Sequence, residues 1–146
     1  MRIRLTPALA LIAACALQPV CAQDPPARMR PQPRPRPDLT VSEYQFAPTN
    51  DKALRVNVAN IGGAGAGASA LRLTVRKIKG VAVGRTMEIQ VPAIAAGQND
   101  WVLLVADGIL PKDVSLKDTT FRVNLDVTNA VSESNEKNNE KWHNLN

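Results

Sequence analysis

Polar side chains gather near the end of the chain, and they are the residues best suited to chemistry. Carboxylate and amide oxygens are the hard ligands that Ca²⁺ prefers, and the segment offers five candidates: Asp126, Asn129, Glu133, Asn135 and Glu136. Their spacing does not match the loop of an EF-hand. The alternative is a structural role, in which these side chains hydrogen-bond the backbone of their own loop where it joins two strands. The sequence allows both, and it offers no other candidate for a cofactor or a metal.

The residues that catalysis needs are scarce. The only histidine, His143, stands next to Trp142 near the C-terminus, where we expect a surface or strand-edge position. Hydrolytic chemistry needs a nucleophile, a base and a group that orients the base, yet carboxylates such as Glu88 and Asp100 are scattered along the chain. The glycine-rich residues 62–67 lack the lysine and the following helix of a phosphate-binding loop. We therefore predict that the protein is not an enzyme.

The first 22 residues predict a secretion signal. Arg2 and Arg4 precede an apolar stretch over residues 5–17, which is too short to span a bilayer. Residues 20–22 then supply the small side chains that a signal peptidase reads, so we expect cleavage after Ala22. The predicted location is the periplasm or the medium.

Both cysteines lie in this leader. Cys15 ends a stretch, residues 12–15, that resembles a bacterial lipobox, so the alternative to secretion is a lipoprotein anchored to the membrane through Cys15. If cleavage instead follows Ala22, Cys21 leaves with Cys15 and the mature chain begins at Gln23. That chain has no disulfide, no thiolate metal site and no cysteine nucleophile.

Residues 23–37 predict a linker. Six of the residues 24–37 are proline, which excludes helix and sheet and favours an extended spacer. Its arginines are either solvated or touch anionic lipid headgroups or cell-wall polymer; they are Arg28, Arg30, Arg34 and Arg36. From Asp38 onward, 12 Lys and Arg are balanced by 12 Asp and Glu. The domain is therefore neutral and lacks the basic face that nucleic acid binding requires.

From residue 39 onward, apolar and polar residues alternate with the period of a β-strand. We expect strands near residues 39–46, 54–58, 71–75, 81–83, 87–91, 101–105, 121–127 and 141–145. A change of parity between Val41 and Tyr44 predicts a bulge, and the glycine- and alanine-rich residues 61–68 predict a loop. Trp101 lies in an apolar run and is expected in the core. The pattern predicts an all-β fold, a single Greek-key sandwich of about seven strands over residues 38–146.

The polar run at residues 126–139 also resembles the closing motif of CARDB domains, a bacterial cell-adhesion-related family with an immunoglobulin-like sandwich. The positions that match the motif are Asp126, Asn129, Val131, Glu133, Asn135, Glu136, Asn138 and Asn139. Residues 37–39 resemble the family's opening Pro-Asp-Leu, and residues 60–62 resemble its Asn-x-Gly turn after the second strand. The resemblance covers residues 38 to about 145 and implies one immunoglobulin-like β-sandwich.

The resemblance and the lack of catalytic groups imply an exported binding or adhesion-type module that presents its sandwich to an envelope or extracellular partner. That partner is an unknown protein or an envelope polymer, and no nucleic acid is expected. A membrane tether is expected only if Cys15 is lipidated. The alternative is a structural accessory subunit of an envelope complex, which docks through an exposed strand edge.

Overall fold

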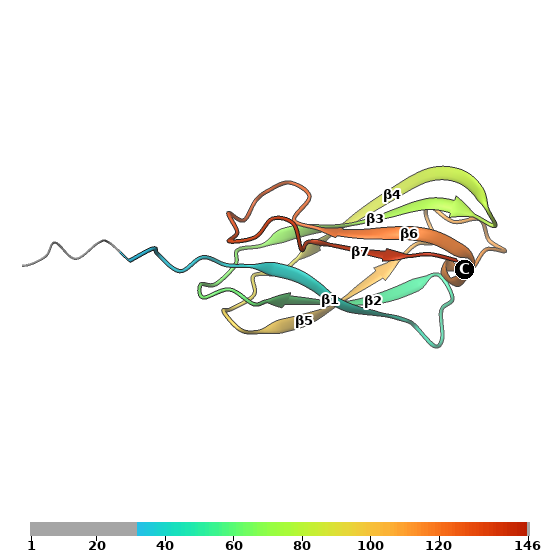
Figure 1. Cartoon of the computed structure of the whole chain (residues 1–146). Helices are drawn as coiled ribbons and strands as arrows, with labels where there is room; N and C mark the ends of the chain where they lie inside the picture. The colour runs from blue at the N-terminus through green and yellow to red at the C-terminus, as the bar shows by residue number, and fades with distance from the viewer. Residues whose placement is uncertain (1–31, 146) are drawn as a thin grey trace, which may run out of the picture. The chain divides into compact units, whose positions relative to one another are not determined.

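The computed structural model describes residues 32–145, which form seven strands and one short 3₁₀ turn (Figure 1). The strands are β1 (Leu39–Phe46), β2 (Ala53–Asn60), β3 (Ser69–Ile78), β4 (Val81–Val91), β5 (Asn99–Val105), β6 (Thr119–Leu125) and β7 (Glu140–His143). The 3₁₀ turn, Leu116–Asp118, leads directly into β6. The predicted signal, residues 1–22, and most of the predicted linker lie outside the described residues. Residues 33–37 of that linker belong to the same compact unit as the strands, Pro33–Asn146.

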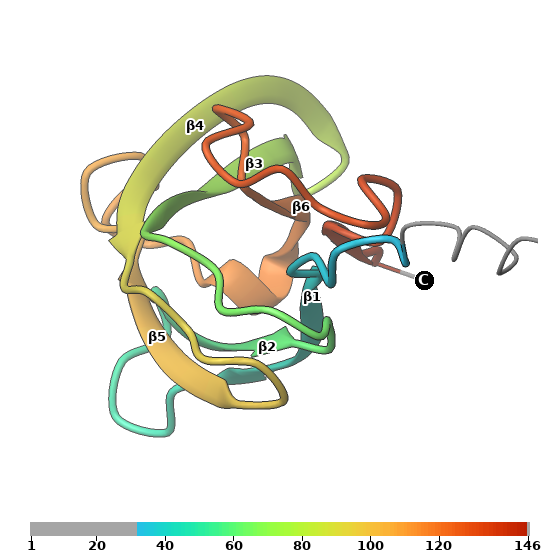
Figure 2. The ribbon, with the colours of Figure 1, turned by 90° about the vertical axis from the view of Figure 1, so that its left-hand side faces the viewer.

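The strands form two antiparallel sheets that pack face to face. One has the order β1-β2-β5 and the other the order β4-β3-β6-β7. The chain crosses between the sheets after β2, after β4 and after β5, so that β5 returns beside β2 and β6 beside β3. The view along the strands shows the two sheets enclosing the core (Figure 2). This confirms the predicted fold class, a single immunoglobulin-like Greek-key sandwich.

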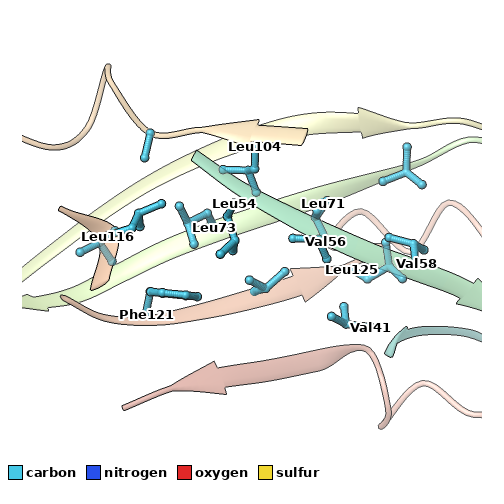
Figure 3. Close-up of a cluster of buried hydrophobic side chains, with 14 of the residues drawn as sticks. Val41, Leu54, Val56, Val58, Leu71, Leu73, Leu104, Leu116, Phe121 and Leu125 are labelled. Atoms are coloured by element: carbon cyan, nitrogen blue, oxygen red, sulfur yellow. The ribbon is translucent and has the colours of Figure 1, made fainter. Parts of the chain in front are cut away.

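The core consists of the alternate residues that each strand turns inward. The central strands contribute most of it (Figure 3): Leu54, Val56 and Val58 from β2, Leu71, Leu73 and Val75 from β3, and Phe121, Val123 and Leu125 from β6. Burying one such side chain contributes about 1.5–3 kcal/mol relative to leaving it in water. Period-two hydrophobicity therefore decides which way each strand faces, and it fixes the register of the pairs.

The bulge expected in β1 is confirmed. The register between β1 and β2 shifts between Val41 and Glu43, which turns both Val41 and Tyr44 toward the core. Ser42 occupies the shifted position, and its hydroxyl donates to the carbonyl of Asn57 at 3.2 Å and to its Oδ1 at 2.7 Å. The extra residue is thus held by a side chain of the neighbouring strand.

Three details differ from the sequence-based expectations. Residues 81–83 and 87–91, expected as two strands, lie in one continuous strand, β4, in which Gly84 at φ 74° accommodates the shift of register with β3. Trp101 is not in the core; it lies on the outer face of β5 with the Arg55 guanidinium 5.0 Å from its ring centroid. Finally, β6 ends at Leu125 rather than 127, because Asp126 takes a left-handed conformation with φ 46°.

Antiparallel strands place every second loop at the same end of the sandwich. The loops over residues 61–68, 92–98 and 126–139 therefore lie at the end where residues 33–38 lead into β1 (Figure 1). The loops over residues 47–52 and 106–118 lie at the opposite end, near the C-terminus. This arrangement brings the polar run at residues 126–139 next to the beginning of β1.

Candidate functional site

Asp126 organises the beginning of the polar run. Its side chain is buried, and its two carboxylate oxygens accept the N–H groups of Ala130 and Val131, each at 3.0 Å. Its carbonyl accepts the N–H of Asn129 at 2.9 Å, and Asn129 also has a left-handed conformation, with φ 50°. Asx side chains tolerate this conformation and often hydrogen-bond nearby backbone. The turn directs Val131 into the core, where it is buried.

Glu133 reaches from the loop to the first strand. Its side chain is only 4% exposed, and Oε2 accepts the N–H of Leu39 at 3.0 Å. With its amide nitrogen facing these groups, Asn139 donates to the same Oε2 at 3.3 Å and to the carbonyl of Leu39. The two side chains together pair both backbone groups of Leu39. At this position they take the place of the neighbouring strand that the edge of β1 lacks. This matters because a buried backbone group without a hydrogen-bond partner destabilises the folded state.

Asp38 makes a second connection between the loop and β1. Its Oδ1 accepts from the amide nitrogen of Asn138 at 2.7 Å, and its Oδ2 accepts from the hydroxyl of Ser134 at 2.9 Å. The N–H of Ser134 donates to the carbonyl of Pro37 at 2.9 Å, and the hydroxyl of Thr40 donates to the carbonyl of Asn138 at 3.0 Å. The loop thereby binds four consecutive residues, 37–40.

Asn60 holds the same segment from the other side. It is 1% exposed, and its Oδ1 accepts the N–H groups of Asp38 and Gly62, both at 3.1 Å. Its amide nitrogen donates to the carbonyls of Ala64 at 2.8 Å and Ile94 at 3.0 Å, so all its hydrogen-bonding positions are used. The Asn-x-Gly sequence recognised as a turn therefore joins the beginning of β1 to two loops.

Gly62 is required for the close approach of these segments. A Cβ atom at this position would lie 2.4 Å from the carbonyl oxygen of Arg36 and 2.5 Å from the backbone nitrogen of Asp38. Both are backbone atoms in a segment fixed by hydrogen bonds, including that from the N–H of Gly63 to the carbonyl of Arg36 at 3.0 Å. Only glycine fits here without displacing residues 36–38.

Three carboxylates of the loop come close together. An oxygen from each of Asp126, Glu133 and Glu136 lies within 4.8 Å of the others, and Glu136 also accepts the N–H of Glu133 at 3.0 Å. The pKa of Glu133 is raised to about 7. Burial is the largest cause and the charges of Glu136 and Asp126 add to it, while hydrogen bonds from Leu39 and Asn139 act to lower the pKa. Glu133 therefore gains and loses its proton near neutral pH.

Three of the five candidate calcium ligands, Asp126, Glu133 and Glu136, form the close group. The side chains of the other two, Asn129 and Asn135, are exposed. Asn135 uses its Oδ1 to accept the N–H of Lys137 at 3.1 Å. The cation-binding chemistry available here is that of three carboxylates, each of which already accepts at least one hydrogen bond.

Side chains also bridge β1 and β7, which the sequence did not predict. The hydroxyl of Tyr44 lies 3.0 Å from Nδ1 of His143, and the ammonium of Lys141 donates to the carbonyl of Ser42 at 2.5 Å. The His143 ring stacks on Phe121 with centroids 4.8 Å apart. His143 is half-buried and lies in β7, an edge strand, which agrees with the strand-edge position expected for it. No local pattern in the sequence indicates the two contacts between β1 and β7, because the partners in each are 99 positions apart.

Outside the loop, Arg34 and Arg36 line an open pocket of about 510 Å³ together with Pro33 and Ser134. Neither arginine forms an ion pair within the part of the chain that the structure describes. Two of the four arginines of the predicted linker are therefore placed beside the domain, with their guanidinium groups available to an anion.

The family model of CARDB matches residues 36–143, which include the whole sandwich and the closing loop. The chain belongs to the CARDB family. The resemblance carried by the closing motif is thereby confirmed, and the CARDB assignment agrees with the immunoglobulin-like topology. No curated protein matches the chain. Between residues 32 and 145, there is no helix with the length and apolar character needed to cross a membrane.

This CARDB chain is similar to two solved structures. One is a domain of a protein named as a cell surface protein from Methanosarcina acetivorans, with 23% identity, a TM-score of 0.52, and coverage of 73% of this chain and 88% of that one. The other is a CARDB domain from Pyrococcus furiosus, solved in complex with di-metal ions, with 22% identity, a TM-score of 0.49, and coverage of 73% and 89%.

Proposed function

We propose that this CARDB chain is an exported, non-enzymatic binding module of the adhesion type, which presents its sandwich to a partner in the envelope or outside the cell. The observation that carries this proposal is the use of the closing loop. Its polar groups, which were the best candidates for chemistry, bind residues 37–40 and so fix the sandwich to the segment that precedes it. The loop therefore attaches the sandwich to the preceding segment, and the partner would bind elsewhere on the surface of the domain.

Export is supported by the predicted signal over residues 1–22 and by the neighbour named as a cell surface protein. Mass spectrometry of the N-terminus of the exported chain tests it. A start at Gln23 supports a periplasmic or secreted product, and a lipid-modified Cys15 supports an anchored lipoprotein. A chain that keeps its first 22 residues in the cytosol contradicts the proposal.

The pocket beside Arg34 and Arg36 supports an anionic envelope polymer as the binding partner. Retention of the exported chain on peptidoglycan or anionic polysaccharide beads tests this partner. The double substitution R34Q/R36Q should weaken retention more than R28Q/R30Q, which removes the same charge from the preceding part of the predicted linker. Equal losses would mean that retention reflects charge alone, and no retention of the unsubstituted chain would exclude these polymers as partners.

A protein partner is the alternative, and the unpaired edge of β5 favours it. In this version the chain is an accessory subunit that gains a strand from another protein of the envelope. A pull-down from envelope extract should recover one defined protein, and added peptidoglycan should not release it. Recovery of no protein, with retention on the polymer beads, would favour the polymer instead.

Calcium binding is the metal-dependent form of the proposal, and the approach of the Asp126, Glu133 and Glu136 carboxylates to within 4.8 Å supports it. Ca²⁺ takes about six to eight oxygen ligands, so backbone carbonyls and water would complete the shell. A cation would relieve the mutual repulsion that raises the pKa of Glu133.

A further inference from the structure

The sandwich has four strand edges, and three of them are protected. The edge of β1 is paired at Leu39 by Glu133 and Asn139 and is covered further along by side chains of β7. The edge of β7 is only four residues long. The edge of β4 is interrupted at Gly84, where the register with β3 shifts. Bulges, short strands and covering side chains are the means by which proteins prevent edges from pairing with other chains.

The edge of β5 has none of these protections. Its register with β2 is unbroken over seven residues, from Asn99 to Val105, and the strand contains no glycine, proline, lysine or arginine. Its single charged residue, Asp100, is near the beginning of the strand. Leu103 is 56% exposed although it is apolar, and Trp101 lies beside it on the same outer face. Such an edge is a template for another strand.

We propose that two copies of this chain associate by antiparallel pairing of their β5 strands. The sequence of β5 is self-complementary in the register that places Val102 on a two-fold axis. Val102 then faces its own copy, and Trp101 faces Leu103 of the second copy, on both sides of the axis. Aromatic and aliphatic residues opposite each other on one face stabilise an antiparallel pair. The two three-stranded sheets would become one sheet with the order β1-β2-β5-β5-β2-β1.

Charge and symmetry favour a second copy as the occupant. From Asp38 onward the chain has 12 basic and 12 acidic residues, so two domains do not repel each other through net charge. A two-fold pairing uses the β5 edge of both copies and is closed, so that association stops at two. This inference is compatible with a polymer partner, and it competes with an accessory-subunit role that uses the β5 edge, because one edge pairs with only one added strand.

Sedimentation equilibrium of the chain as exported tests the proposal over the micromolar to submillimolar range. We expect a monomer–dimer equilibrium without larger species. The substitution L103K adds a charge to the centre of the pairing surface and should raise the dissociation constant by about tenfold or more. The matched control is V81K, which changes a side chain that is 68% exposed on the edge of β4 and should leave the dissociation constant unchanged.

Amide hydrogen exchange provides a second measurement that does not depend on a substitution. The β5 amides that point away from β2 should become more protected as the protein concentration rises, and the β4 amides should not. The proposal is overturned if the chain stays monomeric at all concentrations, if it forms species larger than two, or if L103K and V81K weaken association equally. Both variants replace exposed side chains, so circular dichroism should show an unchanged fold.

Discussion

The carboxylate of Glu133 accepts the N–H of Leu39 at 3.0 Å, across 94 positions of sequence. A side chain from the last loop thus supplies the hydrogen bond that a neighbouring strand would supply to the edge of β1. Asn139 completes the substitution by donating to the carbonyl of Leu39. The polar motif of the CARDB family therefore has a clear physical role in this chain, which is to close the sandwich at the place where the chain enters it.

Glu133 should make the stability of the domain depend on pH. Its folded pKa of about 7 lies above its ordinary value of 4.5, so between these values the folded state binds more protons than the unfolded state. The free energy of unfolding should therefore be highest below about pH 4.5, fall as the pH rises toward 7, and level off above it. The bound on this fall is about 1.4 kcal/mol for each unit of pKa difference.

Thermal unfolding of the unsubstituted chain and of E133Q from pH 4 to pH 8 measures this effect. Gln keeps an acceptor for the N–H of Leu39 but does not titrate, so the difference between the two melting temperatures should change across the interval. The control is E140Q, which removes an exposed carboxylate outside the cluster. A difference between E133Q and the unsubstituted chain that is constant with pH would contradict the assigned pKa.

Replacing Gly62 with alanine should destabilise the domain by about 1–3 kcal/mol, which is the usual range for overpacking. The new Cβ would lie 2.4 Å from the carbonyl oxygen of Arg36, a backbone atom that cannot rotate away. The matched control is G65A in the same loop, where nothing lies within 4 Å of the added atom. Urea unfolding at constant pH measures both, and equal effects would show that residues 36–38 are not packed against this loop.

Replacing Asn60 with alanine should cost several kcal/mol, because it leaves the N–H groups of Asp38 and Gly62 and the carbonyl of Ala64 without their partner. Each unsatisfied buried group costs about 1–3 kcal/mol, less where water enters. Asn129, by contrast, has an exposed side chain and a left-handed backbone, so N129G should change stability little. Urea unfolding of both variants gives the comparison. A loss for N60A below that for N129G would contradict the role assigned to Asn60.

Calcium should raise the melting temperature more at pH 8 than at pH 6, because a proton on Glu133 competes with the cation at the lower pH. Extracellular calcium modules typically bind in the range of about 10⁻⁴–10⁻³ M, so millimolar Ca²⁺ is required. The substitution E136Q should remove the shift, whereas E140Q should keep it, because Glu140 lies outside the carboxylate group. No shift at pH 8 and no heat in calorimetry would exclude a calcium site.

Much of the fold could be predicted from the sequence, because apolar and polar residues alternate along each strand and every such alternation indicates which residues face inward. Even the bulge between Val41 and Glu43 was visible as a change of parity. The same rule failed for Trp101. An apolar run is typical of a strand buried on both faces, but β5 is an edge strand whose outer face carries Trp101 and Leu103.

The sequence identified the polar residues of the closing loop, but it did not indicate which other residues they contact. Asp126, Asn135 and Glu136 bond the backbone of their own loop, as local spacing suggested. Glu133, Asn138 and Asn139 instead bind residues 38–40, and nothing in the local sequence indicates contacts over such a separation. Only the antiparallel topology, which returns β6 to the end where β1 begins, brings these groups together.

The connection between the closing loop and residues 37–40 also determines how the domain bears mechanical load. Residues 33–38 run into β1 at one end of the sandwich, and the C-terminus lies at the other (Figure 1). A pulling force applied through Pro33 therefore acts along β1, parallel to its length. That force is shared by two sets of hydrogen bonds, those from Asp38 and Leu39 to the loop and those between β1 and β2. Because they are loaded together, they must break together rather than one after another. A chain that is tethered through residues 33–38 would therefore resist mechanical unfolding when it is pulled.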